Sequence, residues 1–172
     1  MIDAITNARL VGLHPEMVKR FVNLNGQFSS WAPAGTFLRI TVGLRTWAQQ
    51  AEAFTQGRTL LTGPIITNAS PGFSWHQYGF AVDVVPIVGQ VPDWNIETAN
   101  WQKVFGIIPN VGLFSGSTFK TIAGDDDHIQ LAEIPESPTA ADAALLQTSG
   151  IAAVWVKYFP PGQIITDPEL TA

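Results

Sequence analysis

Residues 74–83 have the sequence Ser-Trp-His-Gln-Tyr-Gly-Phe-Ala-Val-Asp, which places an imidazole and a carboxylate seven positions apart, at His76 and Asp83. The run 80–85 is apolar except for Asp83, which predicts a strand with both faces mostly buried. A carboxylate in such a strand is costly unless it is paired or binds a metal ion. We therefore interpret Asp83 as a candidate metal ligand, and backbone amides near a strand end are its alternative partners.

A second histidine lies in an acidic segment, Gly-Asp-Asp-Asp-His-Ile-Gln-Leu at residues 124–131, where it is His128. Two neutral imidazoles and one carboxylate, with a fourth position left for water, form the ligand set of a catalytic zinc ion rather than a structural one. His76, Asp83 and His128 therefore predict a zinc hydrolase. The third histidine, His14, precedes a proline and an acidic residue, a setting typical of a helix start without a metal.

The three aspartates before His128 are candidates for the carboxylate that carries a proton during catalysis. Asp125 is our choice, because a residue three positions before His128 across a turn can face the metal. Asp127 should point to the opposite side of the strand from His128, and no role is assigned to Asp126. A solvated turn or a calcium-type oxygen cluster is the alternative interpretation of the three aspartates.

Length and composition fit a single globular domain, residues 1–172, with 46% hydrophobic and 13% charged residues. A formal net charge of −5 argues against nucleic-acid binding through phosphate neutralisation. Cysteine is absent, so any metal must be held by His, Asp or Glu. The N-terminus lacks the pattern of a secretory signal, and no apolar run approaches the roughly 20 residues that span a bilayer. We therefore expect synthesis in the cytoplasm.

Periodicity and turn residues predict a small α+β domain, with a central and mostly antiparallel sheet, flanking helices and the zinc site at the sheet. We expect helices at 15–25, 46–56, 95–108, 137–147 and 151–158, and strands at 37–43, 65–67, 80–85 and 127–132. The remaining expectations are a connector at 86–92, a turn-rich segment at 112–117 and an irregular tail from Pro160.

Taken in order, the motifs resemble the LAS-type zinc peptidases, which include D-alanyl-D-alanine carboxypeptidases and the L-alanyl-D-glutamate endopeptidases of bacteriophage endolysins. The likeness rests on Ser74-x-His76-x-x-Gly79-x-Ala81-x-Asp83 and Asp125-x-x-His128-x-Gln130. It extends to Leu13-His14-Pro15, Gly43-Leu44-Arg45-Thr46 with Gln50, Gln56-Gly57-Arg58-Thr59 and Thr67-Asn68-Ala69. The resemblance covers about residues 8–132, and residues 137–158 would follow as a C-terminal helical extension.

The chain departs from the phage-type members of this family near the second histidine. Asp127 and Ile129 stand where those members usually have proline and phenylalanine. Upstream, a Trp-Gly-Gly-like turn is replaced by Leu113-Phe114-Ser115-Gly116. These changes leave the expected ligands intact but bear on the substrate cleft, and hence on the bond that is cleaved.

The resemblance implies a peptidase with one zinc ion on His76, Asp83 and His128 and with Asp125 as the catalytic carboxylate. The substrate would be a stem-peptide amide bond of bacterial peptidoglycan, and an L-alanyl-D-glutamate endopeptidase of the phage endolysin type is favoured. The alternatives are a D-alanyl-D-alanine carboxypeptidase and a non-catalytic virion or wall-binding protein that retains the fold. We expect a monomer with no nucleic-acid partner and no membrane span, which acts on the host cell wall after release.

The resemblance also implies that Arg45 is a cation that stabilises the oxyanion or binds a substrate carboxylate. Its guanidinium is planar and always charged, which suits either task. Arg45 lies between an expected strand and an expected helix, where side chains commonly face a cleft, and a surface salt bridge is the alternative. Ser74 is either a substrate contact or a turn residue. Trp75 and Tyr78 are candidates to line the cleft, with packing as the alternative.

Overall fold

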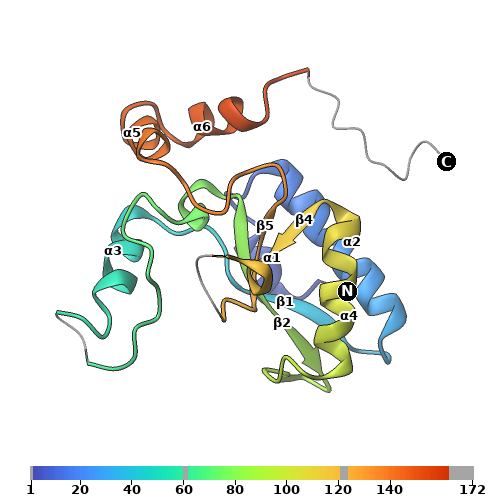
Figure 1. Ribbon diagram of the computed structural model, residues 1–172. Coiled ribbons are helices and arrows are strands. Elements are labelled where there is room, and N and C mark those ends of the chain that lie inside the picture. The colour runs from blue at the N-terminus through green and yellow to red at the C-terminus, as the bar shows by residue number, and fades with distance from the viewer. Residues whose placement is uncertain (1, 60–61, 121–123, 163–172) are drawn as a thin grey trace.

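The computed structural model describes residues 2–59, 62–120 and 124–162 (Figure 1). Its helices are α1 (Ala4–Arg9), α2 (Pro15–Trp31), α3 (Trp47–Thr55), α4 (Ala99–Ile107), α5 (Ala140–Ser149) and α6 (Ile151–Tyr158). Its strands are β1 (Phe37–Val42), β2 (Ala81–Val88), β3 (Val91–Pro92), β4 (Leu113–Ser115) and β5 (His128–Leu131), and its 3-10 helices are η1 (Trp75–Tyr78), η2 (Ile108–Val111) and η3 (Gly116–Thr118). None of the helices in these ranges is long and apolar enough to cross a membrane.

The described strands form one antiparallel sheet with the order β1-β2-β5-β4, and β3 pairs with the end of β2. The register places Asp83 of β2 directly opposite His128 of β5 and, on the other side, opposite Val42 of β1. Residues opposite each other in an antiparallel pair point to the same face, with Cβ atoms about 5 Å apart. The sheet therefore brings two of the expected ligands side by side.

Helix α2 contributes one long apolar side of the core and packs against α4 and β1 (Figure 1). Its fully buried side chains recur every three or four residues, as an amphipathic helix requires: Met17, Phe21, Leu24 and Phe28. His14 caps its N-terminus, because the Nδ1 atom of His14 accepts the backbone N–H of Glu16 at 3.2 Å. The cap sets the start of α2 at the position expected from the sequence.

Helices α5 and α6 pack against each other, and α6 also contacts η1. The indole Nε1–H of Trp155 donates to the carbonyl oxygen of Tyr78 at 2.7 Å. The Trp155 ring also meets the edge of the His14 ring, with centroids 5.0 Å apart. Burial lowers the pKa of His14, as expected for an imidazole enclosed by aromatic rings. The C-terminal helices thus support η1, which carries His76.

The turn from η1 into β2 requires glycine at position 79. Gly79 has a φ angle of 67°, in the left-handed region that other residues rarely adopt. A Cβ atom at this position would also lie 2.8 Å from the carbonyl oxygen of Gly12. The carbonyl of Gly79 in turn accepts the backbone N–H of His14 at 2.9 Å. This close approach fixes the direction in which the chain runs from His76 to Asp83.

The α+β class and the antiparallel sheet with flanking helices are confirmed. The strand expected at 37–43 and the helix expected at 151–158 correspond to β1 and α6. The helix expected at 46–56 corresponds to α3, and the predicted capping box between Thr46 and Gln49 is present.

Other expected boundaries were wrong. Helix α2 continues beyond residue 25, since the position of Gly26 is open and nothing there interrupts the helix. Residues 86–92 are not a connector, because β2 continues and turns into β3 through Gly89 and Gln90, whose φ angles of 53° and 70° suit a tight hairpin. Residues 112–117 include the strand β4 rather than turns alone.

The helix expected at 95–108 begins later, at Ala99, with Thr98 as its cap. The helix expected from residue 137 also begins later, at Ala140, because Thr139 and not Ser137 is its cap. Residues 65–67 form no strand, and Arg58 holds this segment by donating to the carbonyl oxygen of Thr67 at 2.9 Å. The expected irregular tail lies mostly at residues 163–172, outside the described residues.

Candidate metal centre and active-site cleft

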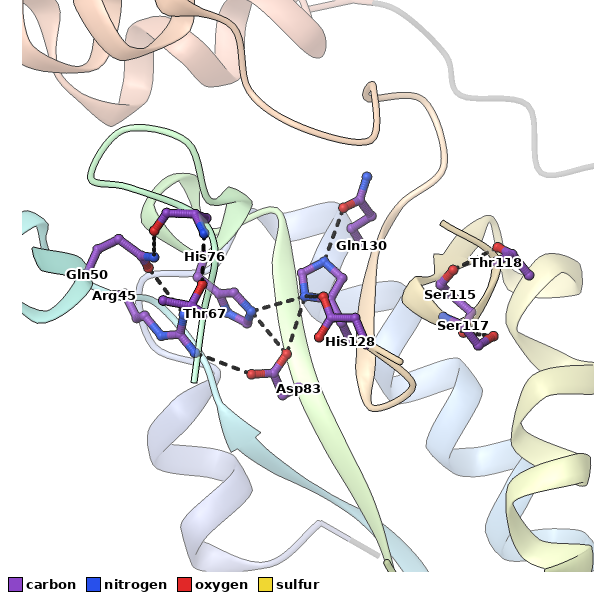
Figure 2. Close-up of polar contacts among 12 residues, drawn as sticks. Arg45, Gln50, Thr67, His76, Asp83, Ser115, Ser117, Thr118, His128 and Gln130 are labelled. Atoms are coloured by element: carbon purple, nitrogen blue, oxygen red, sulfur yellow. Dashed lines mark hydrogen bonds and ion pairs between the residues drawn. The ribbon is translucent and has the colours of Figure 1, made fainter. Parts of the chain in front are cut away.

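Three side chains from two segments of the chain converge at one point of the sheet (Figure 2). His76 comes from η1, Asp83 from β2 and His128 from the first position of β5. The Oδ1 atom of Asp83 lies 3.1 Å from Nε2 of His76 and 3.3 Å from Nδ1 of His128. The two imidazole nitrogens are 3.2 Å apart. The structure thus brings together the three residues that the sequence selects as metal ligands.

Each histidine has its other ring nitrogen next to a fixed acceptor. Nδ1 of His76 lies 3.0 Å from the carbonyl oxygen of Gly43. A carbonyl oxygen only accepts hydrogen bonds, so Nδ1 carries a proton, and Nε2 is the nitrogen that can offer a lone pair to a cation beside Asp83. Nε2 of His128 lies 3.1 Å from Oε1 of Gln130, which leaves Nδ1 of His128 to face the same point. Two imidazole nitrogens and one carboxylate oxygen therefore surround a position that suits a cation.

The charges at this point also suit a cation. Burial raises the pKa of Asp83, but the charge and hydrogen bonds of His76 and His128 outweigh burial and hold the pKa far below its usual range. Burial lowers the pKa of His128, but the hydrogen bond and charge of Asp83 raise it above its usual value. Two nitrogen ligands and one oxygen ligand, with a cleft on one side, match the donor set of a catalytic zinc site. The residues present therefore fit a zinc ion.

Arg45 reaches the centre from the junction between β1 and α3 (Figure 2). Its Nη2 atom lies 3.5 Å from Oδ2 of Asp83. Its Nη1 atom donates to Oε1 of Gln50 at 3.2 Å, and the amide of Gln50 donates to the carbonyl oxygen of Ala69 at 2.7 Å. Arg45 therefore faces the cleft, as its position in the sequence predicts. Gln50 belongs to the motif, but only the structure reveals that it supports the guanidinium.

Asp125 lies at the edge of the centre, with Oδ2 4.0 Å from Nδ1 of His128 and with 38% of its side chain exposed. Burial raises its pKa, and the nearby positive charge of His128 opposes the rise. Asp127 also lines the cleft, although the sequence analysis expected it on the opposite side of the strand from His128. Residues 126 and 127 lie in a turn before β5, where strand alternation does not apply. Burial and the neighbouring Asp83 raise the pKa of Asp127 to about 6.

His76, Asp83 and His128 line a cleft of about 300 Å³. Ser74 lines this cleft and is 8% exposed. Trp75 lines the cleft as expected, although only 2% of it is exposed, whereas Tyr78 is fully buried in the core and does not line the cleft. Their rings pack edge to face. Apolar side chains on the cleft wall that the sequence analysis did not single out are Ile65, Ile66, Phe73 and Phe119.

Comparison with known proteins identifies a curated relative of this chain. No family model matches the sequence. The chain is 32% identical over 130 residues to peptidoglycan L-alanyl-D-glutamate endopeptidase CwlK of Bacillus subtilis (strain 168), a match that covers 69% of this chain and 73% of that protein.

Two solved structures are also similar to this chain. The L-Ala D-Glu endopeptidase ChiX of Serratia marcescens matches with a TM-score of 0.51 and 26% identity, over 74% of this chain and 86% of that one. The vancomycin resistance D,D-dipeptidase VanXYg matches 78% of this chain and 54% of its own, with a TM-score of 0.47 and 10% identity. The match to CwlK covers most of both chains at an identity that establishes relationship, and the ordered motifs agree with it. The chain therefore belongs to the LAS-type zinc peptidase family.

Proposed function

We propose that this protein is a zinc-dependent peptidase of bacterial peptidoglycan and that the bond it hydrolyses is L-alanyl-D-glutamate. The observation that carries the proposal is the convergence of His76, Asp83 and His128 at the wall of an open cleft, with ligand atoms within 4.8 Å of one another. The choice of bond is supported by CwlK and ChiX, which are both named for cleavage between L-alanine and D-glutamate.

In this proposal His76, Asp83 and His128 hold the zinc ion. When bound, a zinc ion polarises a carbonyl group and makes water a nucleophile at neutral pH. The outer nitrogen of each imidazole lies beside an oxygen atom, that of Gly43 for His76 and that of Gln130 for His128, so the inner nitrogens would be available to hold the ion. Such fixed geometry is what a catalytic metal site requires of its protein.

Asp125 is proposed as the general base and then the general acid. Its carboxylate would take a proton from the attacking water as the oxygen bonds to the substrate carbonyl carbon, and would give that proton to the amide nitrogen as the C–N bond breaks. Its place at the rim, 4.0 Å from Nδ1 of His128 and partly exposed to the cleft, supports this role. Asp127 lines the same cleft and is the competing candidate.

Arg45 is proposed to bind negative charge on the substrate, either the developing oxyanion or a carboxylate of the D-glutamate residue. Its guanidinium is oriented by Gln50 and lies beside Asp83 at the cleft wall. A planar, always-charged group with several N–H donors suits both tasks. Ser74, also on the cleft wall, is proposed as a polar contact for the substrate backbone.

The finer proposal is that the protein acts as an endolysin of the phage type, as a monomer on the host wall. The order of its motifs supports this, from the histidine-containing helix start to the aspartate run before His128. The substitutions at Asp127 and Ile129 lie beside the cleft, so the bond cleaved needs a direct test.

The test is a digest of purified peptidoglycan followed by mass spectrometry of the products. We expect new amino termini on D-glutamate, loss of activity with a chelator, and recovery on addition of zinc. Free D-alanine as the main product would identify a D-alanyl-D-alanine carboxypeptidase instead. Walls left intact by the zinc-loaded protein would overturn the proposal and favour a wall-binding role without catalysis. His128→Ala should be inactive under all of these conditions.

A further inference from the structure

One backbone carbonyl, that of Pro135, accepts hydrogen bonds from residues next to both histidine ligands. The indole Nε1–H of Trp75, which directly precedes His76, donates to it at 2.7 Å. The side-chain amide of Gln130, two residues after His128, donates to it at 3.0 Å. Gln130 is 0% exposed and Trp75 is 2% exposed, so neither donor has water as a substitute. The carbonyl of Pro135 therefore connects the two segments that carry the histidines.

The contact with Pro135 also determines which way the amide of Gln130 faces. A carbonyl oxygen only accepts, so the NH₂ group of Gln130 must point to Pro135 and its Oε1 atom must point to His128. Oε1 then accepts a hydrogen bond from Nε2 of His128 over 3.1 Å. With its proton held on Nε2, the neutral imidazole of His128 would present the lone pair of Nδ1 to a metal ion placed between His76 and Asp83. Figure 2 shows Gln130 on the side of the His128 ring opposite to Asp83.

We propose that Gln130 is a positioning residue of the metal centre, which sets the tautomer and orientation of His128 and is itself aligned by the carbonyl of Pro135. The same carbonyl accepts the indole N–H of Trp75 and thereby helps to hold η1, which carries His76, in place. This inference rests on the zinc site of the proposed function and adds to it a residue that touches neither the metal ion nor the substrate.

The effect of losing a hydrogen-bond acceptor next to a metal-bound histidine can be estimated as a change in metal affinity. Removing the group that accepts the free N–H of a metal-bound histidine typically weakens metal binding by about 10–100-fold. In Gln130→Leu, the buried N–H of His128 would have no acceptor and the carbonyl of Pro135 would lose one donor. Gln130→Glu keeps an acceptor for His128 but cannot donate to Pro135. The two variants thus separate the contact with His128 from the contact with Pro135.

The test measures zinc affinity by competition with a chelator, starting from the zinc-loaded full chain. We expect Gln130→Leu to bind zinc about 10–100-fold more weakly than the parent, and Gln130→Glu to recover most of that affinity. Asn25→Leu is the matched control. It removes another buried amide, which accepts the backbone N–H of Leu38 at 2.8 Å, and it should lose stability without losing zinc affinity.

The second arm compares two buried tryptophans that each donate to a backbone carbonyl. Trp75→Phe removes the indole N–H that donates to the carbonyl oxygen of Pro135. Trp101→Phe removes an indole N–H that donates to the carbonyl oxygen of Asp93 at 2.6 Å. We expect only Trp75→Phe to weaken zinc binding. This arm remains informative if Gln130→Leu fails to fold.

Nuclear magnetic resonance of the imidazole protons reports the same contact directly, because the chain has only three histidines. A slowly exchanging Nε2–H signal of His128 should be present in the parent and in Gln130→Glu and absent in Gln130→Leu. Unchanged zinc affinity in Gln130→Leu, or equal loss in Gln130→Leu and Gln130→Glu, would overturn the inference. A parent protein that binds no zinc would instead overturn the proposed function, so the two failures are distinguishable.

Discussion

Asp142 joins the two C-terminal helices through a fully buried carboxylate, and its replacement by alanine should cost measurable stability. Its Oδ2 atom accepts the backbone N–H of Thr139 at 2.8 Å and the hydroxyl of Thr139 at 2.6 Å. Its Oδ1 atom accepts the ammonium of Lys157 at 2.6 Å and the hydroxyl of Tyr158 at 3.1 Å. The carboxylate is 0% exposed, so alanine leaves several of these donors without a partner.

The size of the effect follows from these contacts. Loss of the capping interaction at Thr139 costs about 1 kcal/mol, and loss of a hydrogen bond to a charged group costs about 1.5–3 kcal/mol. Lys157 is 41% exposed and can return to water, so its ion pair adds little beyond these contributions. We therefore expect Asp142→Ala to lower the free energy of unfolding by about 2–4 kcal/mol.

The effect should depend on pH in one direction. Burial raises the pKa of Asp142, but hydrogen bonds from Lys157, Thr139 and Tyr158 outweigh burial and lower the pKa below the usual value of an aspartate. A carboxylate with a lower pKa in the folded state stabilises the fold fully above the pKa of the unfolded chain. This stabilisation declines as the pH falls through the folded-state pKa. The difference between parent and variant should therefore be largest near neutral pH and shrink in acid below about pH 4.

Urea unfolding at a series of pH values measures both quantities. Glu97→Ala, which removes an exposed carboxylate, is the control and should change stability by less than about 0.5 kcal/mol. The reasoning is refuted if Asp142→Ala matches Glu97→Ala at neutral pH, or if its effect grows toward acid pH.

The remaining predictions concern the cleft. Asp125→Asn should lower kcat by about 10²–10⁴-fold while zinc content stays at the parent level, and Asp127→Asn should cost much less in the same wall digest. Arg45→Ala should lower kcat/KM by about 10²–10³-fold, and Gln50→Leu, which removes only the support of the guanidinium, should lower it less. In Gly116→Ala, a Cβ atom would overlap the carbonyl oxygen of Asp125, so stability should fall by about 1–3 kcal/mol in urea unfolding and zinc affinity should fall with it.

Each of these predictions would be contradicted by a specific outcome. A larger loss of kcat in Asp127→Asn than in Asp125→Asn would exchange their roles. A larger loss in Gln50→Leu than in Arg45→Ala would mean that the guanidinium is not the acting group. Gly106→Ala is the control for Gly116→Ala, because its position in α4 has open space for a Cβ atom and should gain stability.

Several features of the candidate site could be predicted from the sequence, for physical reasons. Asp83 stands out because it is a single carboxylate in a run of buried apolar residues. Arg45 could be placed at a cleft because it follows a clear strand and precedes a capping box. The helix that begins after His14 has an apolar spacing that continues to Phe28.

Other features depend on contacts between distant parts of the chain and were not predictable. The register that sets Asp83 opposite His128 is decided by how β2 pairs with β5. Asp127 turned out to face the cleft because the turn before β5 extends through it. The role of Gln130 depends on the carbonyl of Pro135, whose position follows from the path of the chain after β5.

The zinc content of the purified protein tests the central claim most directly. After loading and removal of free metal, we predict one zinc ion per chain in the parent and in His14→Asn, which changes the histidine outside the cluster. His76→Ala, Asp83→Ala and His128→Ala should each lose the ion. Full retention of zinc by these three variants, or no binding by the parent, would contradict the claim that these side chains form a metal site.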